Sequence, residues 1–349
     1  MDLGLQEHMS LNVATQVKVA TKAFIGPPIT DWLKEETMFP RKVRCLCYHL
    51  ALVLSLFILF SRWLSSPPQH IRKELGISPV PGRVFLVRPH LECDREPPFL
   101  VLLVTTRPQE ISERGAIRET WGAERRLGAR RICTFFLLGH GGAYQGQIHR
   151  ESQSHRDILQ GDFTDTYYNL TEKVLLGLEW VHRFCPSAHF VMKTDSDMFV
   201  NIFYLSQLLG GKNTTGFFSG QLMRDIRPIR NKANKWYVSE EEFAPALYPH
   251  YCSGTGYVLS GDLVGKIWGI SKSIPLLKLE DVYVGLCLTR LEVSPIPVSS
   301  RRVFFTRHVP FSVCRYRSLV TSHRVSPSQL RLYWKSLEEA EALECPLAP

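Results

Sequence analysis

The sequence has 349 residues, of which 44% are hydrophobic and 21% charged, and its formal net charge is +9. These proportions are typical of a globular protein, and the length leaves room for a core of roughly 250 residues behind an N-terminal extension. The basic residues are dispersed, with no dense run of Lys and Arg among aromatic residues, so we expect no binding to nucleic acid.

The first recognisable element is an apolar segment at residues 45–64, which predicts a transmembrane signal-anchor. Its core, Cys45–Phe60, reads CLCYHLALVLSLFILF, and the full segment approaches the ~20 residues that span a bilayer. Arg41, Lys42 and Arg44 precede this core, and only Arg62 follows it closely. This charge asymmetry predicts that residues 1–44 are cytoplasmic. A buried core helix is the alternative interpretation, and residues 1–37 are compatible with an alternative upstream start.

Residues 65–96 are rich in Pro, Arg and Glu and predict a luminal stem, followed by a folded domain over residues 97–349. Seven cysteines are spread widely after the anchor with no CxxC pair, which favours disulfides over zinc. Seven is an odd number, so at least one thiol stays free, and Cys133 in a buried strand is our candidate. Two sequons, at Asn169 and Asn213, are predicted N-glycosylation sites if this side is luminal.

Alternating strands and helices open the folded domain. Phe99–Thr106 and Ile132–Leu138 are apolar runs that predict buried parallel strands. Two helices are predicted, at residues 109–121 and at Thr171–Phe184. Thr171 is the predicted cap of the second helix. A further apolar strand follows at His189, and this order predicts a doubly wound α/β domain. No GxGxxG, GxxxxGK[ST] or GxSxG motif supports a dehydrogenase, a P-loop protein or a hydrolase.

The first predicted helix carries three large side chains on one face, because Arg114, Arg118 and Trp121 fall at i, i+4 and i+7. Two interpretations are open. The face is either a solvated basic surface or a nucleotide site, in which the guanidinium groups hold phosphates and the indole lies against the base or ribose.

The segment His189–Asn201, HFVMKTDSDMFVN, runs from an apolar strand into two aspartates one residue apart. Because side chains alternate along a strand, Asp195 and Asp197 are predicted to point the same way. Two carboxylates at the carboxyl end of a sheet strand suit Mg²⁺ or Mn²⁺, and such an ion suits a diphosphate. An isolated DxD pair is commonly a pair of solvated loop carboxylates, but the apolar flanks place this pair at the edge of the core.

Three later features each allow two interpretations. The glycines of Tyr251–Tyr257, YCSGTGY, either let the backbone approach a ligand closely or form a tight loop before a strand. Glu280 and Asp281 begin a predicted helix, either as capping residues or as a general base that the helix dipole keeps ionised. His323 is isolated, so by itself it is either a ligand or a surface or core histidine.

Several segments together strongly resemble the β-1,3-glycosyltransferases of glycosyltransferase family 31. They are RGAIRETW (114–121), FFLLG (135–139), ESQSHRDILQGDFTDTYYNLTEKV (151–174), MKTDSDMFVN (192–201), KWYVS (235–239), YCSGTGYVLS (251–260) and KLEDVYVGLCL (278–288). The resemblance covers the chain from about Met38 to its end. It implies a GT-A-type, doubly wound nucleotide-sugar-binding domain, a UDP-sugar donor, Mn²⁺, and a type II Golgi membrane enzyme with a luminal catalytic domain.

The resemblance also assigns roles to residues of the donor side. Asp197 would bind the metal with His323 as a second ligand, and Asp195 would lie near the ribose or the metal. Ser196 stands where many relatives have a third acidic residue. The expected donor-binding residues are Arg114, Arg118, Trp121, Asp195, Ser196 and Asp197.

On the acceptor side, the resemblance makes Asp281 the catalytic base and Glu280 the residue that orients the acceptor. Trp236 and the segment Gly254–Thr255–Gly256 would line the acceptor or galactose pocket. Relatives often carry a cysteine where this chain has Ser322, and Cys133 appears elsewhere, so disulfide pairing is not carried over.

We therefore expect inverting transfer of galactose from UDP-galactose to the 3-hydroxyl of a terminal GlcNAc on glycoprotein or glycolipid glycans. One alternative is the same chemistry with UDP-GlcNAc as donor. Another is a non-catalytic Golgi glycan-binding relative, against which the presence of Asp197, Asp281 and His323 argues. The motifs do not separate the two donors, and they do not determine the acceptor class, the disulfide connectivity or the oligomeric state.

Overall fold

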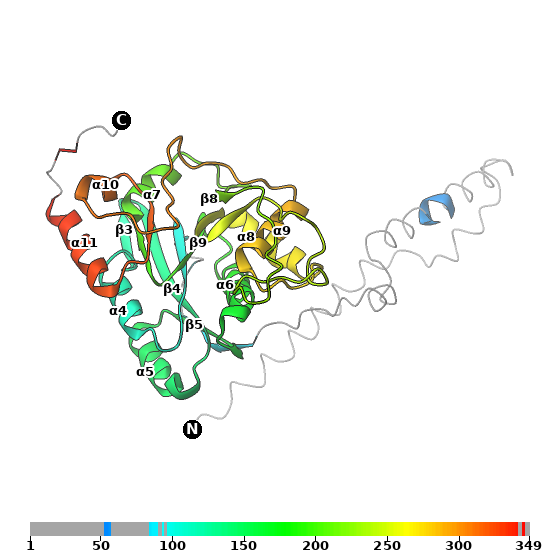
Figure 1. Cartoon of the computed structure of the whole chain (residues 1–349), viewed down its shortest axis with the longest axis horizontal. Helices are drawn as coiled ribbons and strands as arrows, with labels where there is room; N and C mark the ends of the chain where they lie inside the picture. Colours follow the sequence, from blue (N-terminus) through cyan, green and yellow to red (C-terminus); the bar gives the residue numbers. More distant parts are fainter. Residues whose placement is uncertain (1–51, 57–83, 90–92, 94–95, 341–343, 346–349) are drawn as a thin grey trace, which may run out of the picture. The chain divides into compact units, whose positions relative to one another are not determined.

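The computed structural model describes residues 52–56, 84–89, 93, 96–340 and 344–345 (Figure 1). The predicted tail at 1–44 lies outside these residues, as do most of the predicted anchor at 45–64 and most of the predicted stem at 65–96. Residues 52–56 are helical. Within the described part of the chain, no helix is long and apolar enough to cross a membrane.

The described residues of the folded domain form an eight-stranded mixed sheet in the order β1-β5-β4-β2-β6-β9-β8, with β3 paired to β4. Strands β2, β4, β5 and β6 are parallel, and β9 runs antiparallel to β6 and to β8. The strands are β1 (Phe85–Val87), β2 (Leu100–Thr105), β3 (Arg125–Leu127), β4 (Arg130–His140), β5 (Ile158–Thr164), β6 (Phe190–Asp195), β8 (Phe218–Met223) and β9 (Tyr251–Ser260).

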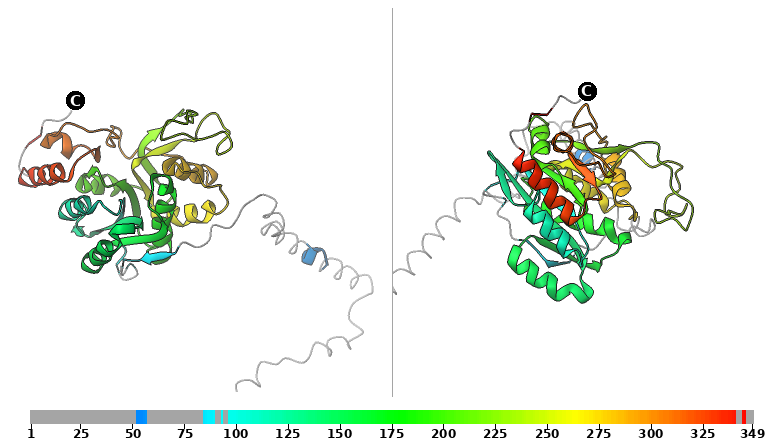
Figure 2. Two further views of the ribbon diagram at one scale, coloured as in Figure 1. Left: turned by 60° about the horizontal axis from the view of Figure 1, so that its bottom comes forward. Right: turned by 60° about the vertical axis from the view of Figure 1, so that its left-hand side comes forward.

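Helices cover both faces of this sheet, as Figures 1 and 2 show. Helices α6, α8 and α9 share one apolar cluster with one face, while α4, α5, α7 and α11 contribute to the cluster on the other. The helices are α4 (Ile111–Glu119), α5 (Gln145–His155), α6 (Leu170–Phe184), α7 (Ile202–Leu209), α8 (Gly261–Ser271), α9 (Glu280–Arg290), α10 (Val313–Arg317) and α11 (Pro327–Glu339). A small separate sheet pairs β7 (Met198–Val200) with β10 (Thr321–His323).

The chain leaves β2 toward β4 and β5 and then returns to add β6 on the opposite side of β2. This reversal of strand order makes the carboxyl ends of β2 and β6 the topological switch point, where ligands of open α/β sheets bind. The prediction of a mixed α/β domain around parallel strands is confirmed. Helix α5 and strand β5, between the second predicted strand and α6, were not predicted.

One local prediction was wrong, and one open interpretation is decided. Thr171 is not the cap of α6: the helix begins at Leu170 after Asn169, and the Thr171 hydroxyl donates to the carbonyl of Leu277 at 2.6 Å. Of the two interpretations of Tyr251–Tyr257, the tight loop is excluded, because the segment is the first part of β9. Its backbone pairs with β6 on one side and β8 on the other, and this pairing outweighs the turn preference of its two glycines.

Disulfides join Cys93 to Cys185 and Cys314 to Cys345. Cys133 carries a free thiol, as predicted, and so do Cys252 and Cys287. All three thiols are buried, and burial raises the pKa of each to about 12. They are therefore protonated, packed side chains at neutral pH and not reactive thiolates.

Helix α9 lies so close to β9 that Gly285 has no room for a side chain. A Cβ at this position would be 2.7 Å from the Tyr251 Cβ and 3.2 Å from the His250 carbonyl oxygen. We expect Gly285→Ala to lower the free energy of unfolding by about 1–3 kcal/mol, because overpacking outweighs the better helix propensity of alanine. Thermal unfolding of the folded domain measures the change.

Gly269 on α8 is the matched control, because a Cβ there would meet no atom within 4 Å. Gly269→Ala is expected to leave stability unchanged or raise it by up to about 1 kcal/mol. A Gly285→Ala protein that unfolds at or above the wild-type temperature would show that the approach of α9 to β9 is not tight.

Candidate functional site

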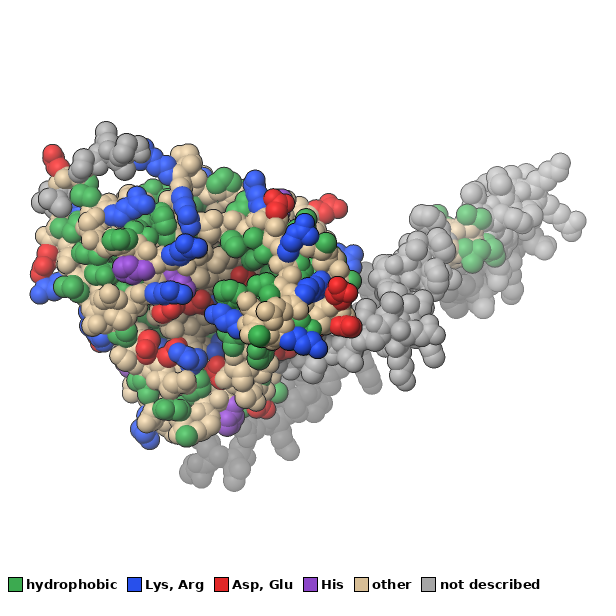
Figure 3. All heavy atoms as spheres, viewed as in Figure 1, with side chains coloured by type: hydrophobic (Ala, Val, Ile, Leu, Met, Phe, Trp, Pro, Cys, Tyr) green, Lys and Arg blue, Asp and Glu red, His purple; other side chains and the backbone are tan. Residues whose placement is uncertain are grey.

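The site lies at the carboxyl ends of β2 and β6. Thr105, the last residue of β2, is paired with Asp195, the last residue of β6, and its hydroxyl donates to the Asp195 carboxylate at 2.7 Å. On the face of the domain seen in Figure 3, acidic side chains gather near the middle, next to histidines and to Lys and Arg side chains. Asp195 therefore lies at the switch point of the sheet.

The two aspartates of the DSD motif do not share one strand. Strand β6 ends at Asp195, Ser196 and Asp197 form a turn, and β7 then begins at Met198. The predicted strand alternation is therefore wrong, although both carboxylates belong to the same end of the sheet. Ser196 turns away from them, and its hydroxyl donates to Glu110 at 2.8 Å.

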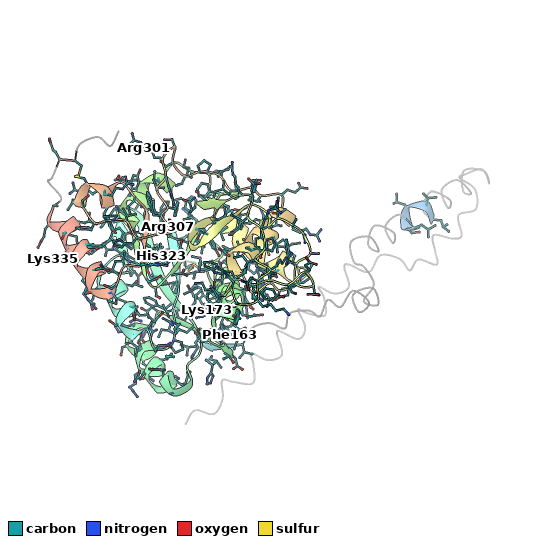
Figure 4. The ribbon with its side chains drawn as sticks, viewed as in Figure 1. Phe163, Lys173, Arg301, Arg307, His323 and Lys335 are labelled. Carbon is teal, nitrogen blue, oxygen red and sulfur yellow. A yellow bond between two sulfur atoms is a disulfide. The ribbon has the colours of Figure 1, made fainter. Side chains whose placement is uncertain are left out.

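The small sheet brings His323 to Asp197. Because β10 pairs with β7, His323 lies opposite Met198, and its Nε2 is 3.1 Å from Asp197 Oδ2. Burial alone would raise the pKa of Asp197, but the hydrogen bond and charge of His323 lower it. In return the Asp197 carboxylate raises the pKa of His323. Figure 4 shows His323 beside Arg307. The backbone N–H of His323 donates to the backbone carbonyl oxygen of Arg307.

This pair fits a divalent cation. The Nδ1 atom of His323 lies 3.0 Å from the carbonyl oxygen of Thr306, which fixes the ring so that Nε2 faces the Asp197 carboxylate. Imidazole nitrogen binds transition-metal ions, and carboxylate oxygen suits Mg²⁺ and Mn²⁺, so the donor atoms are compatible with a divalent cation. In the described part of the chain, no group of three or more His, Cys, Asp or Glu residues is placed to hold a metal. A bound diphosphate and water would complete such a site, as is common for Mg²⁺-like ions.

Asp281 lies in the first turn of α9, which begins at Glu280 after Leu279 as predicted. Its two carboxylate oxygens accept the backbone N–H groups of Gly254 at 3.0 Å and Val282 at 2.9 Å. The residue remains partly exposed. Burial raises the pKa of the carboxyl group, although the two N–H groups oppose this change. Asp281 is thus a partly exposed residue whose carboxylate has a fixed orientation and raised basicity, as a general base requires.

Glu280 points the other way, into the core. It is 3% exposed; one oxygen accepts the Tyr257 hydroxyl at 2.5 Å and the other lies 3.3 Å from the Lys193 ammonium. Burial raises the pKa of Glu280 to about 7, against the opposing effect of Lys193. The side chain is held in this network, where it ties α9 to β9 and β6. The arrangement does not leave its carboxylate free to orient an acceptor.

Lys193 joins these parts of the site. Its ammonium donates to Asp195 at 2.7 Å and to the Gly254 carbonyl oxygen at 2.5 Å, and the side chain is 1% exposed. Burial would lower the pKa of Lys193, but Asp195 and Glu280 raise it above its usual value. Sequence reasoning missed this residue. The signal was available, because Lys193 stands two positions before Asp195 and shares its face of the strand.

Glycines allow β9 to approach the start of α9 closely. A Cβ at Gly254 would be 3.0 Å from a Glu280 oxygen and 3.4 Å from the Asp281 Cβ. Gly256 pairs with Thr194 in β6, and the carbonyl oxygen of Thr255 accepts the Thr194 hydroxyl at 3.0 Å. The close approach predicted for these glycines therefore exists, but the partner is the start of α9. Trp236, on the segment before β9, is 46% exposed.

The three large side chains predicted to bind the nucleotide make their contacts within the folded domain; they are Arg114, Arg118 and Trp121. Arg114 and Trp121 have no exposed surface. Arg114 is paired with Glu151 at 2.6 Å, and Arg118 with Glu151 and Asp157, both at 2.7 Å.

The Trp121 indole donates to the carbonyl oxygen of Met198 at 3.1 Å, so it supports the turn that holds Asp197. It follows α4 and is not part of it, since the helix ends at Glu119. In this arrangement Arg114 and Trp121 have no surface with which to contact a nucleotide.

The two sequon asparagines lie outside the sheet. Asn213 is exposed, and Asn169 is partly exposed at the start of α6, with its amide donating to the Thr164 carbonyl oxygen at 2.8 Å. Both remain predicted acceptors.

Comparison with known proteins shows the family to which this chain belongs. A family model described as "Galactosyltransferase" matches residues 112–299. Beta-1,3-galactosyltransferase 5 of Homo sapiens is 46% identical over 311 residues, which cover 88% of this chain and 99% of the relative. Beta-1,3-galactosyltransferase 2 of Mus musculus is 44% identical over 268 residues, covering 75% of this chain and 64% of that protein.

A solved structure titled "WbbM bifunctional glycosytransferase apo structure" overlaps 53% of this chain and 37% of that chain, with 10% identity. Its TM-score of 0.31 is too low to support a fold assignment.

The class of protein is thus an enzyme that transfers a sugar from a nucleotide-sugar donor to a glycan acceptor. The chain belongs to the galactosyltransferase family.

The buried position of Glu280 makes a prediction about stability and pH. Its pKa rises from 4.5 to about 7 on folding, so the folded state binds the proton more tightly, and stability falls as the pH rises through this window. Glu280→Gln imitates the protonated form. As the pH rises from about 4.5 to 7, the wild type should therefore lose unfolding free energy relative to the Glu280→Gln variant. Urea unfolding at several pH values measures this shift.

The same variant separates a structural role from an acceptor role. If Glu280 acts within the core, Glu280→Gln changes stability and its pH dependence without a specific rise in the KM for acceptor. A large rise in acceptor KM with unchanged stability at every pH would instead assign Glu280 to the acceptor.

Proposed function

We propose that this chain transfers galactose from UDP-galactose to the 3-hydroxyl of a terminal GlcNAc, with inversion to a β-1,3 linkage. The observation that carries the proposal is Asp281, a partly exposed carboxylate fixed by two backbone N–H groups beside the end of β6. The Asp197–His323 pair lies at the same end of the sheet. The domain is proposed to be of the GT-A type, with the donor at the switch point between β2 and β6.

The relatives support the choice of sugar and linkage. The curated relatives named above are called beta-1,3-galactosyltransferases, and the first is matched over almost its whole length. We infer the same donor sugar and linkage for this chain. The competing donor is UDP-GlcNAc, which the same constellation of acids would serve equally well.

In the proposed reaction, Asp281 takes the proton of the acceptor 3-hydroxyl as that oxygen forms a bond to C1 of galactose. The bond from C1 to the diphosphate oxygen breaks, and its electron pair leaves with UDP. No covalent intermediate is required, since a single displacement converts an α-linked donor into a β-linked product. Asp197 and His323 would hold Mn²⁺, which supplies charge stabilisation for the departing diphosphate.

Three further proposals concern the setting of the reaction. Residues 45–64 would anchor the chain in the Golgi membrane with the catalytic domain in the lumen, and Asn169 and Asn213 would then carry N-glycans. The two disulfides suit an oxidising compartment of this kind.

A non-catalytic glycan-binding role is the remaining alternative, and it does not require the fixed orientation of Asp281.

Product analysis tests the proposal directly. The purified chain is incubated with UDP-galactose or UDP-GlcNAc, Mn²⁺ and a GlcNAc-terminated acceptor, and the linkage of the product is determined. We expect β-1,3-linked galactose from the first donor. If only UDP-GlcNAc gives a product, UDP-GlcNAc and not UDP-galactose is the donor. If neither nucleotide sugar gives a product, the non-catalytic role is favoured.

Asp281→Asn is expected to lower transfer by roughly 10²–10⁴-fold, because an amide cannot take the acceptor proton. Asparagine has the size of aspartate and its side-chain oxygen still accepts one backbone N–H, so the folded domain should persist. Its single oxygen can accept only one of the two N–H groups that the carboxylate serves, so a small loss of stability is expected as well. Turnover and UDP affinity are measured together, and near-normal turnover would remove Asp281 as the base.

Asp197→Ala should abolish transfer, and a chelator should do the same reversibly on addition of Mn²⁺. His323→Ala should weaken the Mn²⁺ dependence of UDP binding by about 10–100-fold. Calorimetric titration of UDP with and without Mn²⁺ provides a readout that does not depend on activity. His308→Ala is the control, because His308 is exposed on the neighbouring segment. Full wild-type activity in excess chelator would exclude the metal from the mechanism.

A further inference from the structure

A strip of exposed aromatic side chains lies next to the proposed site. It consists of Tyr167, Tyr168 and Trp236, which are 46%, 56% and 46% exposed. We call these three residues the aromatic strip. The two tyrosines belong to the 3₁₀ helix Tyr167–Asn169 before α6, whereas Trp236 comes from the segment before β9. Folding thus brings together two segments that are 69 residues apart.

Specific contacts hold the strip in place. The Trp236 indole donates to the Tyr167 hydroxyl at 2.9 Å, and the Trp236 backbone N–H donates to the Asn234 side chain at 2.9 Å. The Lys235 ammonium lies 4.6 Å from the centre of the Trp236 ring and 5.6 Å from that of Tyr167. Large aromatic residues that are ordered yet exposed form a rigid binding surface with little entropy left to lose.

The strip is continuous with the site on its acceptor side. Helix α6, which follows the two tyrosines, is tied by its Thr171 hydroxyl to the carbonyl oxygen of Leu277, at 2.6 Å. Leu277 is followed by Lys278, whose ammonium lies 5.8 Å from the Tyr168 ring centre, and α9 then begins at Glu280. Tyr168 and the segment that leads into α9 are thereby held close together, and Asp281 lies in the first turn of that helix.

Electrostatics agree with this placement. Burial raises the pKa of Tyr167 although the hydrogen bond with Trp236 lowers it, and the charge of Asp281 adds to the rise.

We propose that the aromatic strip is a second acceptor subsite, which binds the sugar that precedes the terminal GlcNAc. The proposal rests on the proposed function and extends it to the length of acceptor that the enzyme recognises. Aromatic faces pack against the apolar C–H faces of a pyranose ring, and Lys235 and Lys278 can donate to its hydroxyl groups. The strip lies beside Asp281, where the acceptor hydroxyl must enter, so an extended glycan is the occupant that its position favours.

The test compares a GlcNAc monosaccharide glycoside with a GlcNAc-terminated trisaccharide as acceptors for UDP-galactose. The wild type is expected to have a lower KM for the trisaccharide. Trp236→Ala and Tyr168→Ala should each reduce the ratio of kcat/KM between trisaccharide and monosaccharide by about tenfold, because each removes a ring that only the longer acceptor contacts. The change should appear in KM for the trisaccharide and not in its kcat.

Tyr144→Ala is the matched control. Tyr144 is also an exposed tyrosine of a 3₁₀ helix, 40% exposed, but it belongs to the Gly142–Tyr144 turn before α5. It should leave the ratio unchanged. Tyr167→Phe keeps the ring and removes the hydroxyl that accepts from Trp236, so it tests the order of the strip separately. Tyr168→Ala removes one exposed ring, which keeps the test available if the Trp236 variant fails to fold.

An unchanged ratio in Trp236→Ala and Tyr168→Ala would overturn the subsite, as would an equal loss on both acceptors. A fall in UDP affinity in the same variants, measured by calorimetry, would also overturn it, because the strip would then hold the uracil base. These results differ from failure of the proposed function, in which the wild type itself transfers galactose to neither acceptor.

Discussion

The arrangement of the site depends on one buried ammonium group. Lys193 is almost completely enclosed, and it contacts Asp195, the Gly254 carbonyl oxygen and Glu280. Removing one partner of a buried ion pair costs about 3–5 kcal/mol because the remaining charge stays unpaired in a medium of low polarity. Without Lys193, two carboxylates would lose their counter-charge at the same point. This cation is therefore what allows acidic groups to gather at the end of the sheet.

The same contacts connect the two sides of the proposed reaction. Asp195 belongs to the DSD motif, which is proposed to bind the donor. Glu280 begins the helix that carries the proposed base. Lys193 lies between Asp195 and Glu280 and contacts both. Tyr257 adds a hydroxyl bond to Glu280 from the neighbouring strand. Because Glu280 is fixed from two directions, the next residue, Asp281, is presented to the solvent side in one orientation. A buried network thus sets the position of a partly exposed carboxylate, which is the way an accurate site is supported.

Sequence patterns were reliable where burial is uniform along an element. The apolar runs of β2, β4 and β6 predicted parallel strands because both faces of such strands are covered by helices. The start of α9 was predicted from two acidic residues at a helix N-terminus. Patterns left two interpretations open at Tyr251–Tyr257, a close approach of the backbone to a ligand or a tight loop. There the pairing of β9 with strands on either side decided the conformation, and no local signal records those partners.

The sequence by itself determined the α/β class, the family resemblance and the residues that the proposed chemistry needs, because periodicity and motifs are local properties of the chain. It did not determine which of these residues face a ligand. Arg114 and Trp121 became interior supports and Glu280 became a core carboxylate, since each found a buried partner far away in the sequence. Tertiary structure also made neighbours of Asp197 and His323, and of Tyr167 and Trp236. Side-chain direction depends on which strands and helices pack together, and only the folded chain decides that.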